Sequence, residues 1–192
     1  MLEISAENEA TIQDLLAAFE DETNAQAKYL AFAEKADAEG LHGAASLCRA
    51  AARSEHFHAA SHARVMRHLG VVAWCNRHEI VVKSTVENMR NALEGEEHEI
   101  DAMYPGILED AAKKKNRSVI RTFTQALEAE KAHARLYEEA VALLEAGRSD
   151  SWIEVAREFF VCPECGYTAE TVKKDECCPV CRSSQERFEA VQ

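Results

Sequence analysis

The strongest constraint on this chain is a Glu-x-x-His motif that occurs twice within long helical patterns, at Glu55–His58 and at Glu130–His133. Residues three apart project from the same face of a helix, so each motif presents a carboxylate and an imidazole together. Two such faces turned toward each other would make a cage of oxygen and nitrogen ligands, which indicates a site for metal, and for two metals rather than one. A third match, Glu39–His42, spans Gly40 at a helix break, and we interpret it as incidental.

Four helices are predicted from apolar residues that repeat with a period of about 3.6. They cover approximately residues 8–38, 42–69, 79–114 and 117–145, and a segment at 71–78 crosses between the second and the third. Only 7 glycines and 3 prolines are present, which also favours helix. Pro105 lies inside the third helix and is expected to bend or break it, and Ser118 is a candidate cap for the fourth.

Each of the four apolar stripes carries acidic residues near its middle. A buried glutamate costs several kcal/mol unless it is paired, so this coincidence needs an explanation. Four-helix di-iron proteins take one Glu from each of two helices and Glu-x-x-His from the other two, and these ligands suit iron or manganese. For any single glutamate, an exposed position on a charged helix is the better interpretation, but the register drawn from apolar residues selects the whole set. The candidate ligands are Glu22, Glu55, His58, Glu96, Glu130 and His133.

The register is least secure at 94–105, where several acids compete. The stripe selects Glu96 and Glu99 and leaves Glu97 and His98 facing solvent. His62, one turn beyond His58, is interpreted as a hydrogen-bonded core histidine, with a supporting role next to a ligand as the alternative. The remaining histidines are expected to face outward or to lie near helix ends without a function; these are His42, His56, His68 and His78.

The tail contains two pairs of cysteines, Cys162-x2-Cys165 and Cys178-x2-Cys181, separated by twelve residues. Two such pairs typically hold one tetrahedral metal, and the spacing alone leaves open whether it is a structural zinc or an electron-carrying iron. Cys177 is left out of this set. Cys48 and Cys75 have no C-x2-C partner and are interpreted as buried apolar thiols.

Composition bounds the partners and the compartment. Acids outnumber bases by 34 to 22, giving a formal charge of -12, so a nucleic-acid partner is not expected. No apolar run approaches the roughly 20 residues that cross a bilayer, and no membrane association is predicted. The start MLEISAENEA lacks the features of a signal peptide, which predicts a cytoplasmic protein whose cysteines are thiols or metal ligands. The helical period is lost near Phe160, so we expect domains at 1–148 and 160–192 joined by a linker at 149–159.

Five segments carry a resemblance to a known family: FEDETNAQAKY, SEHFH, EGEEHEIDAMYP, EAEKAH and the CPECGY/CPVC pair. Together they make nearly the whole chain resemble rubrerythrin, a family that joins a ferritin-like di-iron bundle to a rubredoxin-like domain. The resemblance implies a mainly α protein: a ferritin-like four-helix bundle followed by a small rubredoxin-like four-cysteine metal domain with short β-strands.

The resemblance also implies roles for individual residues. Carried over position by position, it adds Glu99 to the di-iron ligands and makes His58 the ligand that alternates with Glu99 when the redox state changes. Tyr29 and Tyr104 correspond to tyrosines near the cluster. The implied di-iron set is Glu22, Glu55, His58, Glu96, Glu99, Glu130 and His133, and the implied mononuclear iron set is Cys162, Cys165, Cys178 and Cys181.

The activity implied by the resemblance is reduction of hydrogen peroxide to water in protection against oxidative stress. Electrons would pass singly through the four-cysteine iron from a soluble donor such as an NAD(P)H-dependent reductase or rubredoxin. A homodimer is implied too, with the four-cysteine domain of one subunit serving the cage of the other. Two alternatives stay open: a ferroxidase or iron-handling protein, and a non-catalytic metal-binding protein with a zinc-ribbon tail.

Three features depart from the family pattern. The acidic pair Glu20-Asp21 stands where small residues are more usual, and Cys177 directly precedes a cysteine ligand. Trp74 and Cys75 lie in the crossing segment, which the pattern does not map. None of these departures removes a ligand, but together they leave substrate access and partner docking open.

Overall fold

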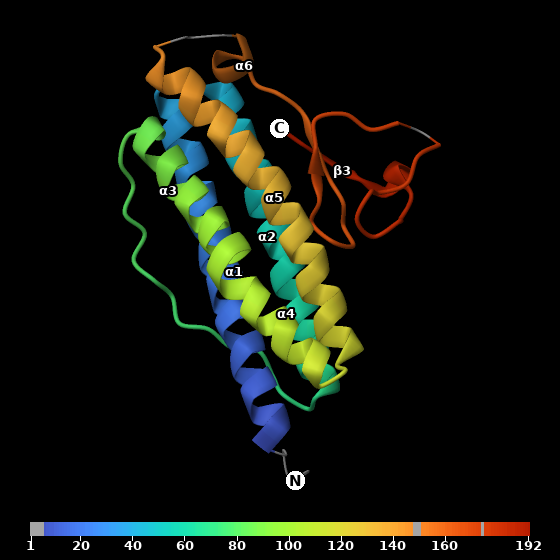
Figure 1. The fold of residues 1–192 in the computed structure, drawn as a ribbon. Coiled ribbons are helices and arrows are strands. Elements are labelled where there is room, and N and C mark those ends of the chain that lie inside the picture. The colour runs from blue at the N-terminus through green and yellow to red at the C-terminus, as the bar shows by residue number, and fades with distance from the viewer. Residues whose placement is uncertain (1–5, 148–150, 174) are drawn as a thin grey trace.

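The protein is a bundle of long helices with a small β-containing domain against one side (Figure 1). The structure, a computed structural model, describes residues 6–147, 151–173 and 175–192. The first five residues, on which the expectation of no signal peptide partly rests, lie outside the described residues, as does the predicted boundary at 148. The helices are α1 (Ala6–Ala38), α2 (His42–His68), α3 (Thr85–His98), the π-helix η1 (Glu99–Met103), α4 (Tyr104–Lys113), α5 (Arg117–Glu145) and α6 (Ser151–Glu154).

Two apolar clusters fill the bundle and leave its middle to polar residues. One cluster contains Phe32, Leu47 and Leu136, and the other contains Leu15 and Phe123. Along α1, α2 and α5, the predicted ligands fall between the residues of these two clusters. The helices therefore bury apolar surface above and below the acids, and that burial offsets the cost of placing the acids in the core.

The third helix begins later than predicted. The prediction of helix from residue 79 is wrong: residues 71–84 form an extended segment, here called the strap, and α3 starts at Thr85. Ser84 and Glu87 form a reciprocal capping box that fixes this start. Val82, which lies two helical turns before the buried Met89 and so fits the same apolar stripe, is 43% exposed. Its β-branched neighbours favour extended backbone, and apolar spacing alone does not reveal that preference.

Pro105 does not end the helix. It lies in the first turn of α4, where a missing backbone N–H costs little, and the disturbance falls just before it, in η1. The N–H of Tyr104 donates to the carbonyl of Glu99, five residues earlier, so this turn holds one residue more than an α turn. At the start of α5, Asn116 is the cap instead of the predicted Ser118, and its side chain accepts from Val119 N at 3.3 Å.

The C-terminal domain is built on a three-stranded antiparallel sheet of order β2-β1-β3. Its strands are β1 (Phe159–Val161), β2 (Thr168–Ala169) and β3 (Glu189–Val191), and a 3-10 turn, η2 (Gln185–Arg187), precedes the last. Phe159 and Val161 of β1 belong to the same buried cluster as residues of α2 and α5. The domain is thus packed on the bundle through shared apolar surface, and short helix α6 lies within the predicted linker.

Within the described part of the chain, no helix has both the length and the apolar character needed to cross a bilayer.

Candidate metal centres

The seven predicted cage residues all lie at mid-height in the bundle, and all are buried. Glu22 comes from α1, Glu96 from α3 and Glu99 from η1, while α2 and α5 supply the two Glu-x-x-His pairs. Six of the seven are at most 2% exposed, and Glu99 is the most accessible at 8%. The structure therefore brings together every residue of the predicted cage, and their roles as ligands stay a prediction.

Six of these residues form two overlapping groups of four, and in each group the candidate ligand atoms lie within 4.8 Å of one another. The first group contains Glu22 and His58 and the second contains Glu96 and His133, whereas Glu55 and Glu130 belong to both. Two ligand groups that have two carboxylates in common are expected where a pair of metal ions shares carboxylate ligands. Glu99, the residue that the resemblance makes the alternate of His58, lies outside both groups.

The buried charges of the cage suit a bound cation. Burial and then the neighbouring Glu130 and Glu22 raise the pKa of Glu55 well above its usual range. Burial alone would lower the pKa of His58, but Glu130 and Glu22 outweigh it and hold that pKa well above the ordinary value. Carboxylate oxygens of Glu22, Glu96 and Glu130 are fully buried, and the groups that face them are the imidazoles of His58 and His133. So many buried carboxylates around two imidazoles are expensive in a core, and metal ions at the two groups would balance them, so the residues fit this cofactor.

Two tyrosines hold carboxylates of the cage in place. The hydroxyl of Tyr29 donates to Glu96 Oε1 at 2.7 Å, and the hydroxyl of Tyr104 donates to Glu22. Burial, and then the nearby glutamates, raise the pKa of both phenols, so both stay protonated and remain donors. His62 stacks on Phe123 and lies 3.2 Å from Thr122 Oγ1 and 3.5 Å from Glu22. It is therefore a hydrogen-bonded core histidine that also contacts a cage carboxylate.

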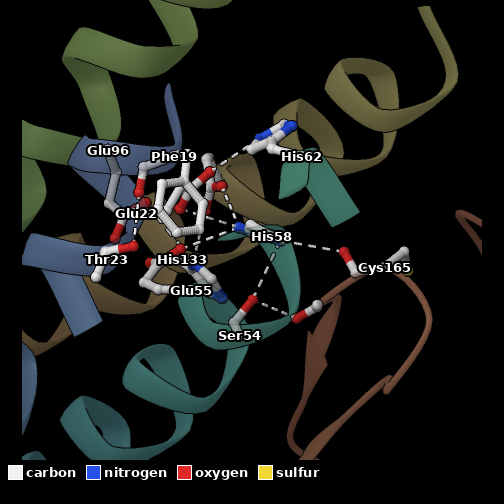
Figure 2. A network of polar contacts seen from close by, with 12 residues as sticks. Phe19, Glu22, Thr23, Ser54, Glu55, His58, His62, Glu96, His133 and Cys165 are labelled. Carbon is white, nitrogen blue, oxygen red and sulfur yellow. Dashed lines mark hydrogen bonds and ion pairs between the residues drawn. The ribbon is translucent and has the colours of Figure 1, made fainter. Parts of the chain in front are cut away.

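The outer nitrogens of both cage histidines meet the C-terminal domain, as Figure 2 shows for His58. His58 Nε2 lies 3.1 Å from the carbonyl oxygen of Cys165, and His133 Nε2 lies 3.0 Å from Thr168 Oγ1. The hydroxyl of Ser54 donates to the carbonyl of Gly166 at 2.6 Å. The sequence pattern did not single out Ser54 or Thr168. For Gly166 the only available signal was its position directly after Cys165.

These contacts determine which imidazole nitrogen carries the proton. A carbonyl oxygen only accepts, so a bond to Cys165 requires a hydrogen on His58 Nε2. The hydroxyl of Thr168 donates to Gly166 O at 3.2 Å, which leaves its oxygen to accept from His133 Nε2. When the imidazoles lose their second proton, as metal binding requires, the lone pair is then on Nδ1, the atom that faces the carboxylates.

The four predicted cysteines of the tail form a second compact group, with their sulfurs within 4.8 Å of one another. Cys162 Sγ lies 3.5 Å from Cys181 Sγ, and Cys165 Sγ lies 3.6 Å from Cys178 Sγ. Sulfurs bound at about 2.3 Å to one metal stand about 3.8 Å apart at the corners of a tetrahedron. The observed spacings match that figure, so the group fits one tetrahedral metal.

The two cysteine knuckles share a turn but not an environment. The residue after each second cysteine has a left-handed backbone, with φ of 78° at Gly166 and 68° at Arg182. Arg182 is exposed and has room for its side chain. A Cβ on Gly166 would stand 2.1 Å from His58 Nε2 and 2.4 Å from Ser54 Oγ. Glycine is therefore required at 166 by the contact with the cage as well as by the backbone.

The remaining cysteines lie away from both groups. Cys48 is buried in the bundle, Cys75 is partly buried in the strap, and Cys177 is exposed. Burial raises the pKa of the Cys48 thiol to about 12, which agrees with the predicted inert core thiol. Cys75 was expected to be buried as well, but the strap leaves it partly accessible.

The structure thus defines a ferritin-like bundle with a two-metal carboxylate–histidine site and a rubredoxin-like four-cysteine domain. A family model described as rubrerythrin matches residues 14–141. Rubrerythrin-2 of Clostridium acetobutylicum is 34% identical over 97% of this chain and 100% of its own length. Nigerythrin of Nitratidesulfovibrio vulgaris is 29% identical over 94% of this chain and 86% of its own. The chain belongs to the rubrerythrin family, whose members are di-iron proteins associated with oxidative stress.

Solved structures agree with this assignment. The structure titled as fully reduced, all-ferrous nigerythrin matches with a TM-score of 0.80 at 30% identity, over 94% of this chain and 86% of that one. A bacterioferritin of Desulfovibrio desulfuricans matches with a TM-score of 0.72 at 18% identity, over 88% of this chain and 95% of that one, which supports the fold alone. The predicted fold class is therefore confirmed.

Proposed function

We propose that this protein is a peroxidase that reduces hydrogen peroxide to water at a di-iron centre. The observation that carries the proposal is the contact between His58 Nε2 and the carbonyl of Cys165, which joins the cage directly to a residue of the four-cysteine group. The overall reaction is H2O2 + 2e⁻ + 2H⁺ → 2H2O. Two ferrous ions, when bound, supply one electron each, which matches this stoichiometry.

The side chains divide the work of holding the cofactors. Glu55 and Glu130 belong to both groups and would help to hold both irons, while Glu22 and His58 would hold one and Glu96 and His133 would hold the other. Exchange between His58 and Glu99 on redox change remains part of the proposal, supported by the position of Glu99 outside both groups. Iron in the four-cysteine site is proposed over zinc, because only iron there relays electrons.

The protein around the cage positions groups and excludes water. Tyr29 and Tyr104 keep their phenolic protons and fix the orientation of Glu96 and Glu22. Burial of the carboxylates strengthens every charge interaction inside the cage. The hydrogen bond from His58 to Cys165 gives electrons a short covalent and hydrogen-bonded route between the two centres, both of which are within one chain.

This relay modifies the expected arrangement of subunits. The resemblance implied that the four-cysteine domain of one subunit serves the cage of another, but here the chain's own domain contacts His58 and His133. We propose that electrons pass within one chain and that a soluble donor, a reductase or a rubredoxin, reduces the four-cysteine iron. A homodimer stays a prediction, and in it each subunit would be complete.

Metal analysis and an anaerobic assay on one preparation test the activity. We expect two irons in the cage plus one in the four-cysteine site, a visible ferric-thiolate band that dithionite bleaches, and rapid reoxidation of the reduced protein by peroxide. Faster reoxidation by oxygen with net iron oxidation would instead favour a ferroxidase. A colourless tail with stoichiometric zinc would favour the non-catalytic alternative.

Mixing two inactive variants tests the route of electrons. A chain carrying Glu130→Ala lacks a working cage, and one carrying Cys178→Ala lacks a working relay. If electrons pass within one chain, the co-refolded mixture has no more donor-driven peroxide turnover than either variant alone. Recovery of turnover on mixing would show that the domain of one subunit serves another.

A further inference from the structure

A cavity of about 560 Å³ lies between α1, α3 and the strap and reaches the cage. Its inner lining includes Glu99 and Tyr29, and its outer lining includes Ile80 and Val81 of the strap. Glu99, the most exposed of the cage residues, is the only one of the seven that lines this cavity. The cavity therefore gives access to the cage at the carboxylate of Glu99.

The cavity and the four-cysteine domain are on opposite sides of the bundle. In Figure 1 the strap runs along one side and the β-containing domain packs against the other. On the domain side, Cys165, Gly166 and Thr168 cover the outer nitrogens of the histidines and leave that face closed. A small solute thus has an approach to the cage from the strap side, while electrons enter from the domain side.

Side chains of α1 hold the strap in place at its middle. Asn76 N donates to Glu20 Oε2 at 2.8 Å, and His78 N donates to Asn24 Oδ1 at 3.0 Å. The Asn24 amide also donates to Asn76 O at 2.9 Å, and His78 Nε2 lies 3.1 Å from Glu20 Oε1. An extended segment away from a sheet has no neighbouring strand to bond, so these two side chains provide partners that its backbone lacks.

The C-terminal end of the strap is fixed separately, by a residue of α3. The side chain of Asn88 accepts from Lys83 N at 2.9 Å and donates to Lys83 O at 3.1 Å. Between the two fixed points, Ile80 and Val81 stand over the cavity with 38% and 64% exposure. These apolar side chains would lose water-exposed surface by dropping into the cavity, and the two sets of hydrogen bonds oppose that movement.

We propose that peroxide reaches the cage through this cavity and that Glu20 and Asn24 are positioning residues that keep it open by holding the strap. The inference rests on the proposed peroxidase function. It gives a role to the acidic residue Glu20, which departs from the family pattern, and to the crossing segment that the pattern did not map. It also separates the entrance of the substrate from the entrance of electrons.

Narrowing the cavity tests the route. Asn91 lines the cavity from the exposed side of α3, and Asn91→Trp places a large ring there. The matched control is Glu94→Trp, an exposed position of the same helix outside the lining. Stopped-flow mixing of reduced holoprotein with hydrogen peroxide should show a rate about tenfold lower in Asn91→Trp, about 1.4 kcal/mol in the barrier, and an unchanged rate in the control. Equal rates in both variants would overturn the proposal.

Releasing the strap tests the positioning residues. In the double variant Glu20→Ala/Asn24→Ala, Ile80 and Val81 should fall into the cavity, so the peroxide rate falls about threefold or more. Reduction of the cage through the four-cysteine centre should not change. A general loss of stability would instead slow both the reaction with peroxide and the reduction of the cage. Amide hydrogen exchange at Asn76 and His78 should quicken in this variant and not in Asn91→Ala.

The outcomes separate the two proposals. If the wild-type protein is not reoxidised by peroxide at all, the proposed function fails and the route is wrong with it. If the wild type reacts and the released strap exchanges faster without any change in the peroxide rate, the route alone is wrong. Unchanged amide exchange would show that Glu20 and Asn24 do not hold the strap.

Discussion

The two Glu-x-x-His motifs are identical in spacing and equally buried, yet different parts of the tail orient them. His58 bonds the backbone carbonyl of Cys165, which itself belongs to the four-cysteine group, whereas His133 bonds the side-chain hydroxyl of Thr168 in β2. Both contacts put the imidazole lone pair on the cage side. Only the first contact reaches a residue of the four-cysteine group, so the motif in α2 joins the cage to that group and the motif in α5 does not.

The largest expected effect comes from removing each histidine in turn. His133→Ala should cost at least about a hundredfold in metal affinity, because it removes the imidazole of its group and no residue is proposed to exchange with it. His58→Ala should retain both cage metals, since Glu99 is buried beside the carboxylates of Glu22 and Glu130 and is its proposed alternate, and should lose donor-driven peroxide turnover. Metal analysis after dialysis, with turnover measured on the same samples, checks the difference. Similar metal loss in the two variants would make the motifs equivalent and remove the contrast.

The second prediction concerns a substitution that moves the four-cysteine group away from the cage without replacing a proposed ligand. In Gly166→Ala the added Cβ would overlap His58 Nε2 and Ser54 Oγ, so the domain must move away from the bundle. Electron transfer from the four-cysteine site to the cage should slow about tenfold or more, while the reduced cage should react with peroxide as before.

A control variant distinguishes backbone strain at a left-handed glycine from loss of the contact between the domain and the cage. Gly40 has a similar φ of 77° and nothing within 4 Å of its added Cβ, so Gly40→Ala imposes comparable backbone strain at a remote place. Stopped-flow bleaching and recovery of the ferric-thiolate band measures the transfer. Normal transfer in Gly166→Ala would mean that the His58–Cys165 contact is not the route.

A smaller effect sharpens the role of the second motif. Thr168→Val keeps the shape of the side chain but leaves the buried His133 Nε2–H without its acceptor, which costs about 1–3 kcal/mol. Metal affinity of the cage should fall about tenfold, as for other partners of a metal-binding histidine. Glu189→Ala is the matched comparison, because it removes the hydrogen bond that Arg53 donates to the same domain at 2.7 Å, away from the cage histidines, and it should leave metal affinity unchanged. A competition titration with a chelator measures both, and an equal fall in the two variants would contradict the assignment.

The bundle and the cage were predictable from sequence because their signals are local. Apolar spacing fixed the phase of α1, α2 and α5, and that phase alone brought Glu22, Glu55 and Glu130 to the inside. The contacts of Ser54 and Thr168 were not predictable in this way, because they join segments far apart in the chain through packing. The start of α3 was not predicted because Val82 keeps a helical spacing to Thr85 and Met89, while the branched side chains of Val81 and Val82 favour extended backbone.

The π-turn at Glu99–Met103 makes the length of this helix matter as much as its composition. Each residue of an α-helix advances about 100° around the axis, so deleting one residue here would turn everything after it by that angle. Tyr104 would swing away from Glu22, and the apolar residues of α4 would face water. Graft or chimera designs that take α4 from an uninterrupted ferritin-like helix must therefore keep the extra residue, and sequence alignments across this point need a one-residue gap wherever the counterpart is a regular α-helix.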